Sequence, residues 1–242
     1  MDADLDTLAT ALYVKTDDLL RSAPQRAPWR PAIGFSPRIP GSALPRPRRS
    51  AQIITQGVEC ARSRDAVHRS ELAGWAEYGY CASHSRYFWG LRLHMLATLH
   101  GLPMGFALTG AKADERTVLL DILHTDPTLS APRPGQTIIG DKNYFGAEFE
   151  TTLAEAGLTL LRPARKGEPP RAGTRFFKPL RQTIESIFDT YKGQLNLEGH
   201  GGKTPTGVLV RVLQRILALT TAIWHNDHTG QSIKRSLLAY DH

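Results

Sequence analysis

This sequence of 242 residues has few cysteines, no long hydrophobic run and no basic leader. No run reaches the roughly 18 to 20 uncharged apolar residues that a membrane-spanning helix needs. The first residues, MDADLDTLATALY, are acidic where a signal peptide is basic. The two cysteines, Cys60 and Cys81, form no CxxC pair, which argues against a disulfide framework and a cysteine zinc site. We therefore expect a soluble cytoplasmic protein without membrane contact.

Acidic residues are missing from residues 21–50, and this gap sets the charge of the whole chain. The segment contains seven arginines and neither Asp nor Glu, whereas the other 23 basic residues are balanced by 23 acidic ones. The net charge of +7 therefore comes from this segment, and it favours a polyanionic partner.

The distribution of proline divides the chain into three parts. Residues 1–21 carry a short helical pattern of leucines and form an N-terminal helical remnant. Residues 22–50 contain seven prolines, which exclude regular helix and central strand, so we expect a disordered Pro/Arg-rich linker. Residues 51–242 form the main domain.

Within the main domain, hydrophobic periodicity predicts an α/β fold. Strands are expected at 52–59, 87–99, 104–109, 136–140 and 159–161, and helices at 115–124, 147–156, 179–195 and 207–225. Three strands followed by alternating helices and strands are typical of the RNase H-like fold, a mixed sheet flanked by helices.

Two segments carry candidate chemistry. Asp141 follows a buried-type strand, at the sheet edge where α/β proteins bind ligands, although a turn or a helix cap explains an Asp there equally well. On the helix 179–195, Arg181 and Glu185 are one turn apart, and Lys192 lies two turns below Glu185 on the same side. An exposed Arg–Glu pair of the ordinary i, i+4 kind is the alternative for this second segment.

The run DKNYF, followed by R-x3-E-x6-K, resembles the bacterial insertion-sequence transposases of the DDE superfamily. Their signature Y-x2-R-x3-E-x6-K is matched by Arg181, Glu185 and Lys192, whereas Lys178 stands at the tyrosine position. The resemblance covers about residues 58–242, and the first 20 residues also resemble the start of these proteins. Further matching text is VECARSR (58–64), HRSELAGWAEYGYCASHSRYFWGLRLH (68–94) and RILALTTAIWHN (215–226).

The resemblance implies a DNA transposase that cleaves and transfers DNA strands with two Mg²⁺ or Mn²⁺ ions held by three carboxylates. Asp141 and Glu185 would be two of these metal ligands, and Arg181 and Lys192 would act beside them. The implied partners are double-stranded DNA, as transposon ends and target, and further copies of the chain in a homo-oligomer or a mixed oligomer with intact transposase.

The third carboxylate is where the sequence departs from this family. The first Asp stands in a stretch of the type D-S-T-P-V-E-C, and counting back from the VEC at 58–60 places Ile54 there. Glu59 and Asp65 are the nearest substitutes, but an offset of five residues directs Glu59 to the opposite face of a strand. The helical domain expected before the catalytic core is also replaced by the linker. We therefore expect an internally deleted, degenerate transposase with impaired metal chemistry.

Basic and aromatic residues supply candidate DNA contacts. The aromatic residues at the entry to the strand 87–99 either stack on bases or pack the sheet. Packing is favoured for Phe88 and Trp89, and both readings stay open for Trp75 and Tyr78. A solvated loop is the alternative for the basic segment. The basic candidates are Lys142, Arg162, Arg165, Lys166, Arg171 and Arg175.

Three hypotheses follow from these patterns. The first is an active or descended DDE transposase, the second is a catalytically inactive DNA-binding remnant that competes with intact transposase or has no activity, and the third is another RNase H-like nuclease. The first two predict that Asp141 and Glu185 converge beside Ile54, with carboxylates roughly 4 to 8 Å apart.

Overall fold

The computed structural model describes residues 32–35, 50–61, 64–81, 85–129, 135–171, 173, 177–231 and 237. All of them belong to the unit formed by residues 31–242. The predicted helix within 1–21 and most of the predicted linker lie outside the described residues.

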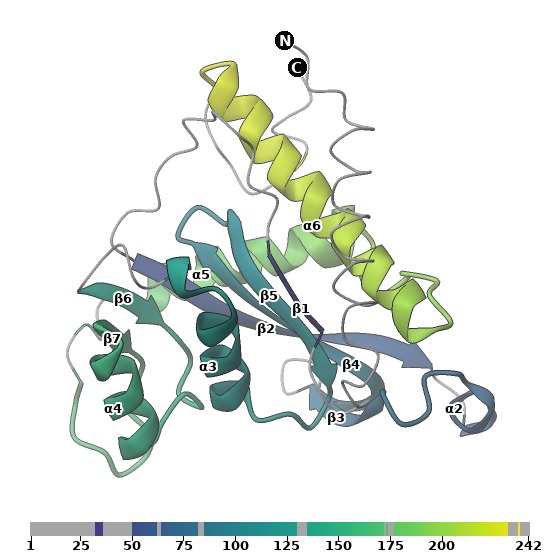
Figure 1. Cartoon of the computed structure of the whole chain (residues 1–242), viewed down its shortest axis with the longest axis horizontal. Coiled ribbons are helices and arrows are strands. Elements are labelled where there is room, and N and C mark those ends of the chain that lie inside the picture. The colour runs from purple at the N-terminus through teal and green to yellow at the C-terminus, as the bar shows by residue number, and fades with distance from the viewer. Residues whose placement is uncertain are drawn as a thin grey trace. The chain divides into compact units, whose positions relative to one another are not determined.

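Seven strands form one mixed sheet in the order β1-β5-β4-β2-β6-β7, with β3 paired to β4 (Figure 1). β4 is antiparallel to both β2 and β5, whereas β6 is parallel to β2 and to β7. This is the predicted RNase H-like arrangement. The strands are β1 (Ala32–Phe35), β2 (Ser50–Ala61), β3 (Glu77–Cys81), β4 (Arg86–Thr98), β5 (Pro103–Gly110), β6 (Gln136–Ile139) and β7 (Leu158–Leu161).

The four helices predicted in the main domain are confirmed, and a fifth is added. The helices are α2 (Arg64–Arg69), α3 (Glu115–Thr125), α4 (Ala147–Glu155), α5 (Phe177–Asp189) and α6 (Pro205–His228). A short 3-10 turn, η2 (Pro127–Leu129), follows α3. The predicted helix 179–195 ends earlier than expected, because its last turn is a π-helical turn, η4 (Thr190–Gln194). Figure 1 shows α3 in front of the sheet and α4 beside β6 and β7.

Strand β1 corrects the prediction of a disordered linker over residues 22–50 at four of its residues. Its residues AIGF lie between Pro31 and Pro37 and contain no proline, so each can join a ladder of hydrogen bonds. They pair antiparallel with β5, from Ala32 opposite Leu108 to Phe35 opposite Gly105.

One face of the sheet packs against α3 and α4. Side chains alternate along a strand, so Ala51 and Ile53 of β2 face these helices together with their neighbours on β4 and β6. This core consists of Ala51, Ile53, Leu96, Leu119, Leu123, Ile138, Tyr144, Phe149, Leu153 and Leu158. Thr55 continues the same face, and its hydroxyl lies 3.1 Å from that of Tyr144.

The opposite face carries the alternate residues of the same strands and packs against α5 and η4. Ile54 is paired with Met95, whose sulfur accepts a hydrogen bond from the Tyr191 hydroxyl at 3.5 Å. Ile187 of α5 reaches the turn between β4 and β5, since a Cβ on Gly101 would lie 3.1 Å from it. Position 54 and the end of α5 therefore share one face.

Helix α6 is long and apolar enough to cross a membrane by length and composition alone. It nevertheless contains Arg211 and Arg215, and its residues Val208, Val212 and Ile216 are buried within the protein. These features are those of a helix that completes a protein core.

Candidate active site

Asp141 lies two residues after the end of β6, in a turn that its own side chain stabilises. Its Oδ1 accepts a hydrogen bond from the backbone N–H of Asn143 at 2.6 Å, and its Oδ2 accepts one from the Asn143 amide at 3.3 Å. Gly140 makes room for this turn, because a Cβ there would lie 2.9 Å from the buried ring of Tyr144. The Asp141 side chain is exposed, so the turn leaves it accessible to a ligand.

Ile54 and Asp141 lie equally far along the chain beyond the last pair of the ladder between β2 and β6. Gln52 is paired with Ile139 in the parallel ladder of β2 and β6, and each candidate lies two residues further along its chain. Ile54 is 2% exposed and forms part of the hydrophobic core. Its aliphatic side chain fills the place of the expected first carboxylate and offers no ligand to a metal.

Glu59, the first of the two candidate substitutes, lies on the face of β2 opposite to Ile54. Glu59 lies four residues after Thr55 in β2, so it is on the same face of the sheet as Thr55, which faces Tyr144. The irregularity in the pairing of β2 begins only after Glu59. Its carboxylate is 3.1 Å from the Arg86 guanidinium. Asp65 lies in the first turn of α2, and its side chain is outside the described residues.

Helix α5 and its π turn carry the second set of candidates. Glu185 is exposed near the middle of α5, and Arg181 lies one turn before it, with a side chain outside the described residues. The π turn has a hydrogen bond from Leu195 N–H to the Thr190 carbonyl, five residues back. This wider turn rotates Lys192 away from its ideal α-helical position. The Lys192 ammonium lies 3.7 Å from a carboxylate oxygen of Glu198.

A partly buried ion pair near Asp141 was not anticipated from the sequence. Arg92 on β4 binds Glu115, the first residue of α3, at 3.0 Å. Burial, and next the nearby charge of Asp141, raise the pKa of Glu115. Its Oε2 is buried without a hydrogen-bond partner among the described residues. The only sequence signal was an acidic residue at a predicted helix start, which is too common to mark a site.

The carboxylates do not fit the complete two-ion site that the resemblance implies. Such a site needs three acidic ligands, and position 54 supplies none. Within the described ranges, no three His, Cys, Asp or Glu side chains gather as metal ligands. The approach of Asp141 and Glu185 stays a prediction.

The basic candidates fall into two groups. Lys142, Arg165 and Lys166 are exposed, as DNA contact requires. Arg162 is only 2% exposed and lies 2.9 Å from Glu150 and 2.8 Å from Glu168, so its predicted phosphate contact is wrong. Arg171 is also engaged, at 2.7 Å from Glu150, and Arg175 lies outside the described residues.

The aromatic candidates divide between core and surface. Phe88 and Trp89 are buried, as expected, and Trp75 is half-buried. Three tyrosines on the β3–β4 hairpin remain exposed, and the rings of Tyr80 and Tyr87 are in contact with centroids 5.1 Å apart. Tyr78, the third, was left open between both readings and is 51% exposed.

Comparisons with known proteins were made against families, curated proteins and solved structures. Residues 56–221 match the family model described as transposase DDE domain. A solved piggyBac transposase, in a synaptic complex with hairpin DNA, has a TM-score of 0.52 at 9% identity. The likeness covers 80% of this chain and 51% of that chain, so this chain spans about half of its length and shares its fold. The search of the curated proteins finds no match.

Proposed function

Because this chain belongs to the family of transposase DDE domains, we propose that it is a DNA-binding protein of insertion-sequence origin whose DNA cleavage is impaired. The observation that carries the proposal is the family match over residues 56–221, on a sheet with the RNase H-like strand order. The solved neighbour, a transposase in complex with DNA, supports double-stranded DNA as the partner.

The DNA contacts that we propose are largely electrostatic. Lys142 is exposed after β6, Arg165 and Lys166 are exposed after β7, and the arginines of residues 21–50 supply the net positive charge. Transposon ends and target DNA offer closely spaced phosphates that such cations bind with little regard to sequence. We place this binding in the cytoplasm.

We assign four residues to the metal-dependent DNA cleavage of the family. Asp141 and Glu185 are the metal-binding carboxylates, and Arg181 and Lys192 are the cations beside the DNA phosphates. Ile54 leaves this set without its first acid. Mg²⁺ is commonly held by one or two carboxylates and water, so weak binding of one ion is compatible with the two that remain.

An inactive remnant is the second candidate function, and Ile54 is the observation that favours it. Such a chain competes with intact transposase for DNA ends or joins it in mixed oligomers. It differs from an active enzyme in one respect that can be measured, since DNA is bound and left uncut.

The proposal is tested by the binding of the full chain to a duplex taken from the DNA that flanks its reading frame. We expect fluorescence anisotropy to show affinity that falls by about 10³ or more between 50 and 200 mM salt if about six phosphates are contacted. The absence of binding at 50 mM salt, or binding that salt does not change, would contradict it.

A further inference from the structure

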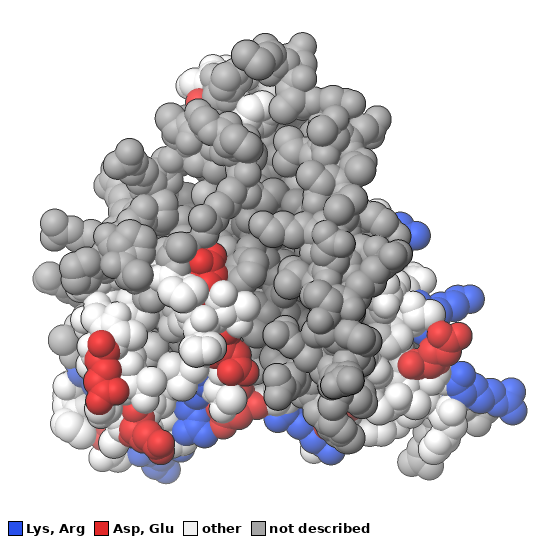
Figure 2. Space-filling view, in the orientation of Figure 1, with Lys and Arg blue, Asp and Glu red and all other residues white. Residues whose placement is uncertain are grey.

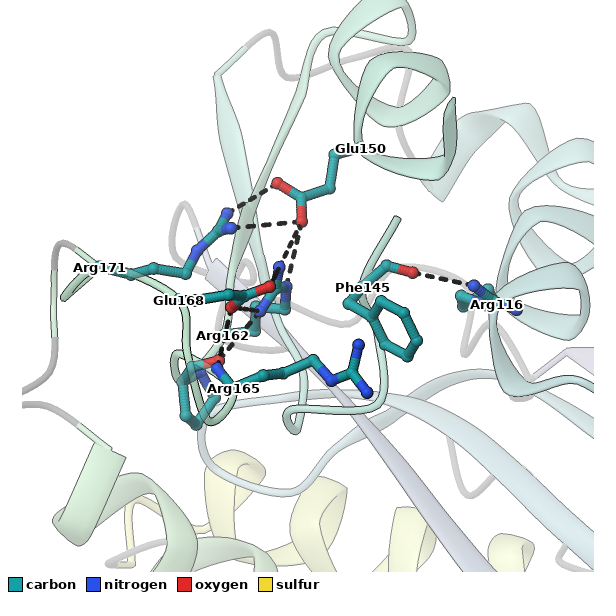
Figure 3. Close-up of polar contacts among 8 residues, drawn as sticks. Arg116, Phe145, Glu150, Arg162, Arg165, Glu168 and Arg171 are labelled. Atoms are coloured by element: carbon teal, nitrogen blue, oxygen red, sulfur yellow. Dashed lines mark hydrogen bonds and ion pairs between the residues drawn. The ribbon is translucent and has the colours of Figure 1, made fainter. Parts of the chain in front are cut away.

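Phe145, four residues after Asp141, lies between two guanidinium groups (Figure 3). The Arg165 guanidinium carbon is 3.6 Å from the centre of the ring, and that of Arg116 is 5.2 Å from it. Arg116 also donates a hydrogen bond to the Phe145 carbonyl at 3.0 Å. The ring thus holds the Arg165 side chain at a fixed place beside the loop that carries Asp141.

The loop that carries Arg165 is fastened by a buried cation. The Arg165 backbone N–H donates to Glu168 at 2.8 Å, and Glu168 in turn binds the Arg162 guanidinium. Arg162 also binds Glu150 of α4, so it joins the loop to the helix that follows the Asp141 turn. The Arg162 hydrogen bonds come first among the interactions that lower the pKa of Glu168 to about 2. Arg162 therefore positions Arg165, although Arg162 itself is buried.

Arg165 differs from the neighbouring arginines, each of which is paired with an acidic residue. Arg162 and Arg171 are paired with glutamates, and Arg116 is paired with Asp114. In the part of the chain that the structure describes, no carboxylate pairs with the exposed Arg165 guanidinium. Figure 2 shows acidic and basic side chains next to one another along the lower edge of the visible face.

The geometry suits a phosphate. Stacking on an aromatic ring uses the face of a guanidinium and leaves its N–H donors in the plane, where they match the oxygens of a phosphate. We propose that Arg165, stacked on Phe145, binds a backbone phosphate of double-stranded DNA beside Asp141, and that Arg162 is its positioning residue. This inference rests on the proposed function, which supplies the DNA.

The experiment measures the slope of log K against log salt for the full chain and duplex DNA, from 50 to 200 mM. Arg165→Gln should reduce the slope by about 0.9, the value of one lost phosphate contact, and weaken binding several-fold. Phe145→Leu, which keeps the charge, should weaken binding with a smaller change in slope. Arg211→Gln is the matched control, since it removes an exposed arginine of α6 and should leave the binding contribution of Arg165 intact.

The positioning role of Arg162 is tested in two backgrounds. Arg162→Met should weaken DNA binding in the parent chain and have no further effect on binding in the Arg165→Gln chain. Circular dichroism checks that each variant is folded, and the two surface variants, Arg165→Gln and Phe145→Leu, test the contact if Arg162→Met does not fold. Equal effects in both backgrounds would overturn the positioning role.

Other outcomes separate this inference from the proposed function. DNA binding with an unchanged slope in Arg165→Gln would overturn the inference alone, whereas no DNA binding by the parent chain would overturn the proposed function. If inorganic phosphate raises the melting temperature of the parent but not of Arg165→Gln, while both bind DNA equally, the site takes free phosphate and the assignment to DNA is wrong.

Discussion

Position 54 on β2 and the loop after β6 both follow the end of the parallel ladder between these strands, and their residues differ in character. On β2, Ile54 is buried in the hydrophobic core at the position where the resemblance predicts an acid. In the loop after β6, Asp141 has an exposed carboxylate. The Phe145 ring of the same loop is covered by Arg165, which has no acidic partner among the described residues. The difference teaches that stability of the sheet and chemistry at its edge depend on separate residues, so one can be lost while the other remains.

The largest effect is expected at Ile54, because it is a buried core residue. Ile54→Ala should lower the free energy of unfolding by about 2 to 5 kcal/mol, because it removes buried methyl groups and leaves a cavity. Lys142→Ala, on the exposed loop, should change it by less than about 0.5 kcal/mol. Urea denaturation measures both, and a similar small loss in the two variants would erase the contrast between the regions.

Substitution of Gly140 tests how tightly the loop after β6 packs against the core. Gly140→Ala should cost about 1 to 3 kcal/mol, since its Cβ would lie 2.9 Å from the Tyr144 ring and force that buried side chain to move. Gly193→Ala is the control, because nothing lies within 4 Å of a Cβ at that position. Equal melting temperatures for the two variants would show that the Asp141 turn is not held by Tyr144.

Protonation of His94, which lies on the same face of the sheet as Thr55, makes the stability of the core depend on pH. Burial, and next the charge of Arg92, lower the pKa of His94 to about 3. The unfolded chain binds a proton near pH 6.5 and the folded chain does not, so stability falls as pH drops from about 6.5 toward 3, by up to about 1.4 kcal/mol per pH unit. His94→Gln should remove this part of the slope in urea titrations between pH 4 and 6. An unchanged slope would show that His94 is protonated in the folded chain.

Among the candidate metal ligands, Asp141 should contribute little to stability. Asp141→Ala loses the hydrogen bonds to Asn143, which are exposed, and relieves the repulsion of Glu115. We expect a change of no more than about 1 kcal/mol in thermal unfolding. A loss as large as that of Ile54→Ala would mean that Asp141 serves the fold and not a ligand.

The sequence predicted most elements of the sheet but few of the contacts at its edge. Hydrophobic periodicity placed β4, α3 and β6 within about one residue, because each buries one regular face. It missed β1, since the prolines around residues 32–35 obscured a four-residue strand, and it missed the π turn, which depends on packing and not on local pattern. The burial of Arg162 was also hidden, because its partners Glu150 and Glu168 are known only once the helix and loop are placed.

The predicted roles of the site residues came from the resemblance to a transposase family, because residue spacing alone does not indicate them. The R-x3-E-x6-K pattern on a helix is common, and only its combination with DKNYF pointed to Asp141 and Glu185. The same resemblance indicated that Ile54 stands where an acid is expected, although Ile54 looks like an ordinary core residue when the strand is considered alone.

The central claim is that this chain keeps the DNA-binding surface of a DDE transposase and has lost its cleavage chemistry at position 54. The most direct measurement is nicking of a supercoiled plasmid that carries the flanking DNA, with Mg²⁺ or Mn²⁺, by the parent chain and by Ile54→Asp. We predict binding without nicking for the parent, nicking by Ile54→Asp, and its loss in the double variant with Asp141→Ala. Nicking by the parent chain that Asp141→Ala abolishes would contradict the claim, because the first acid would then lie elsewhere.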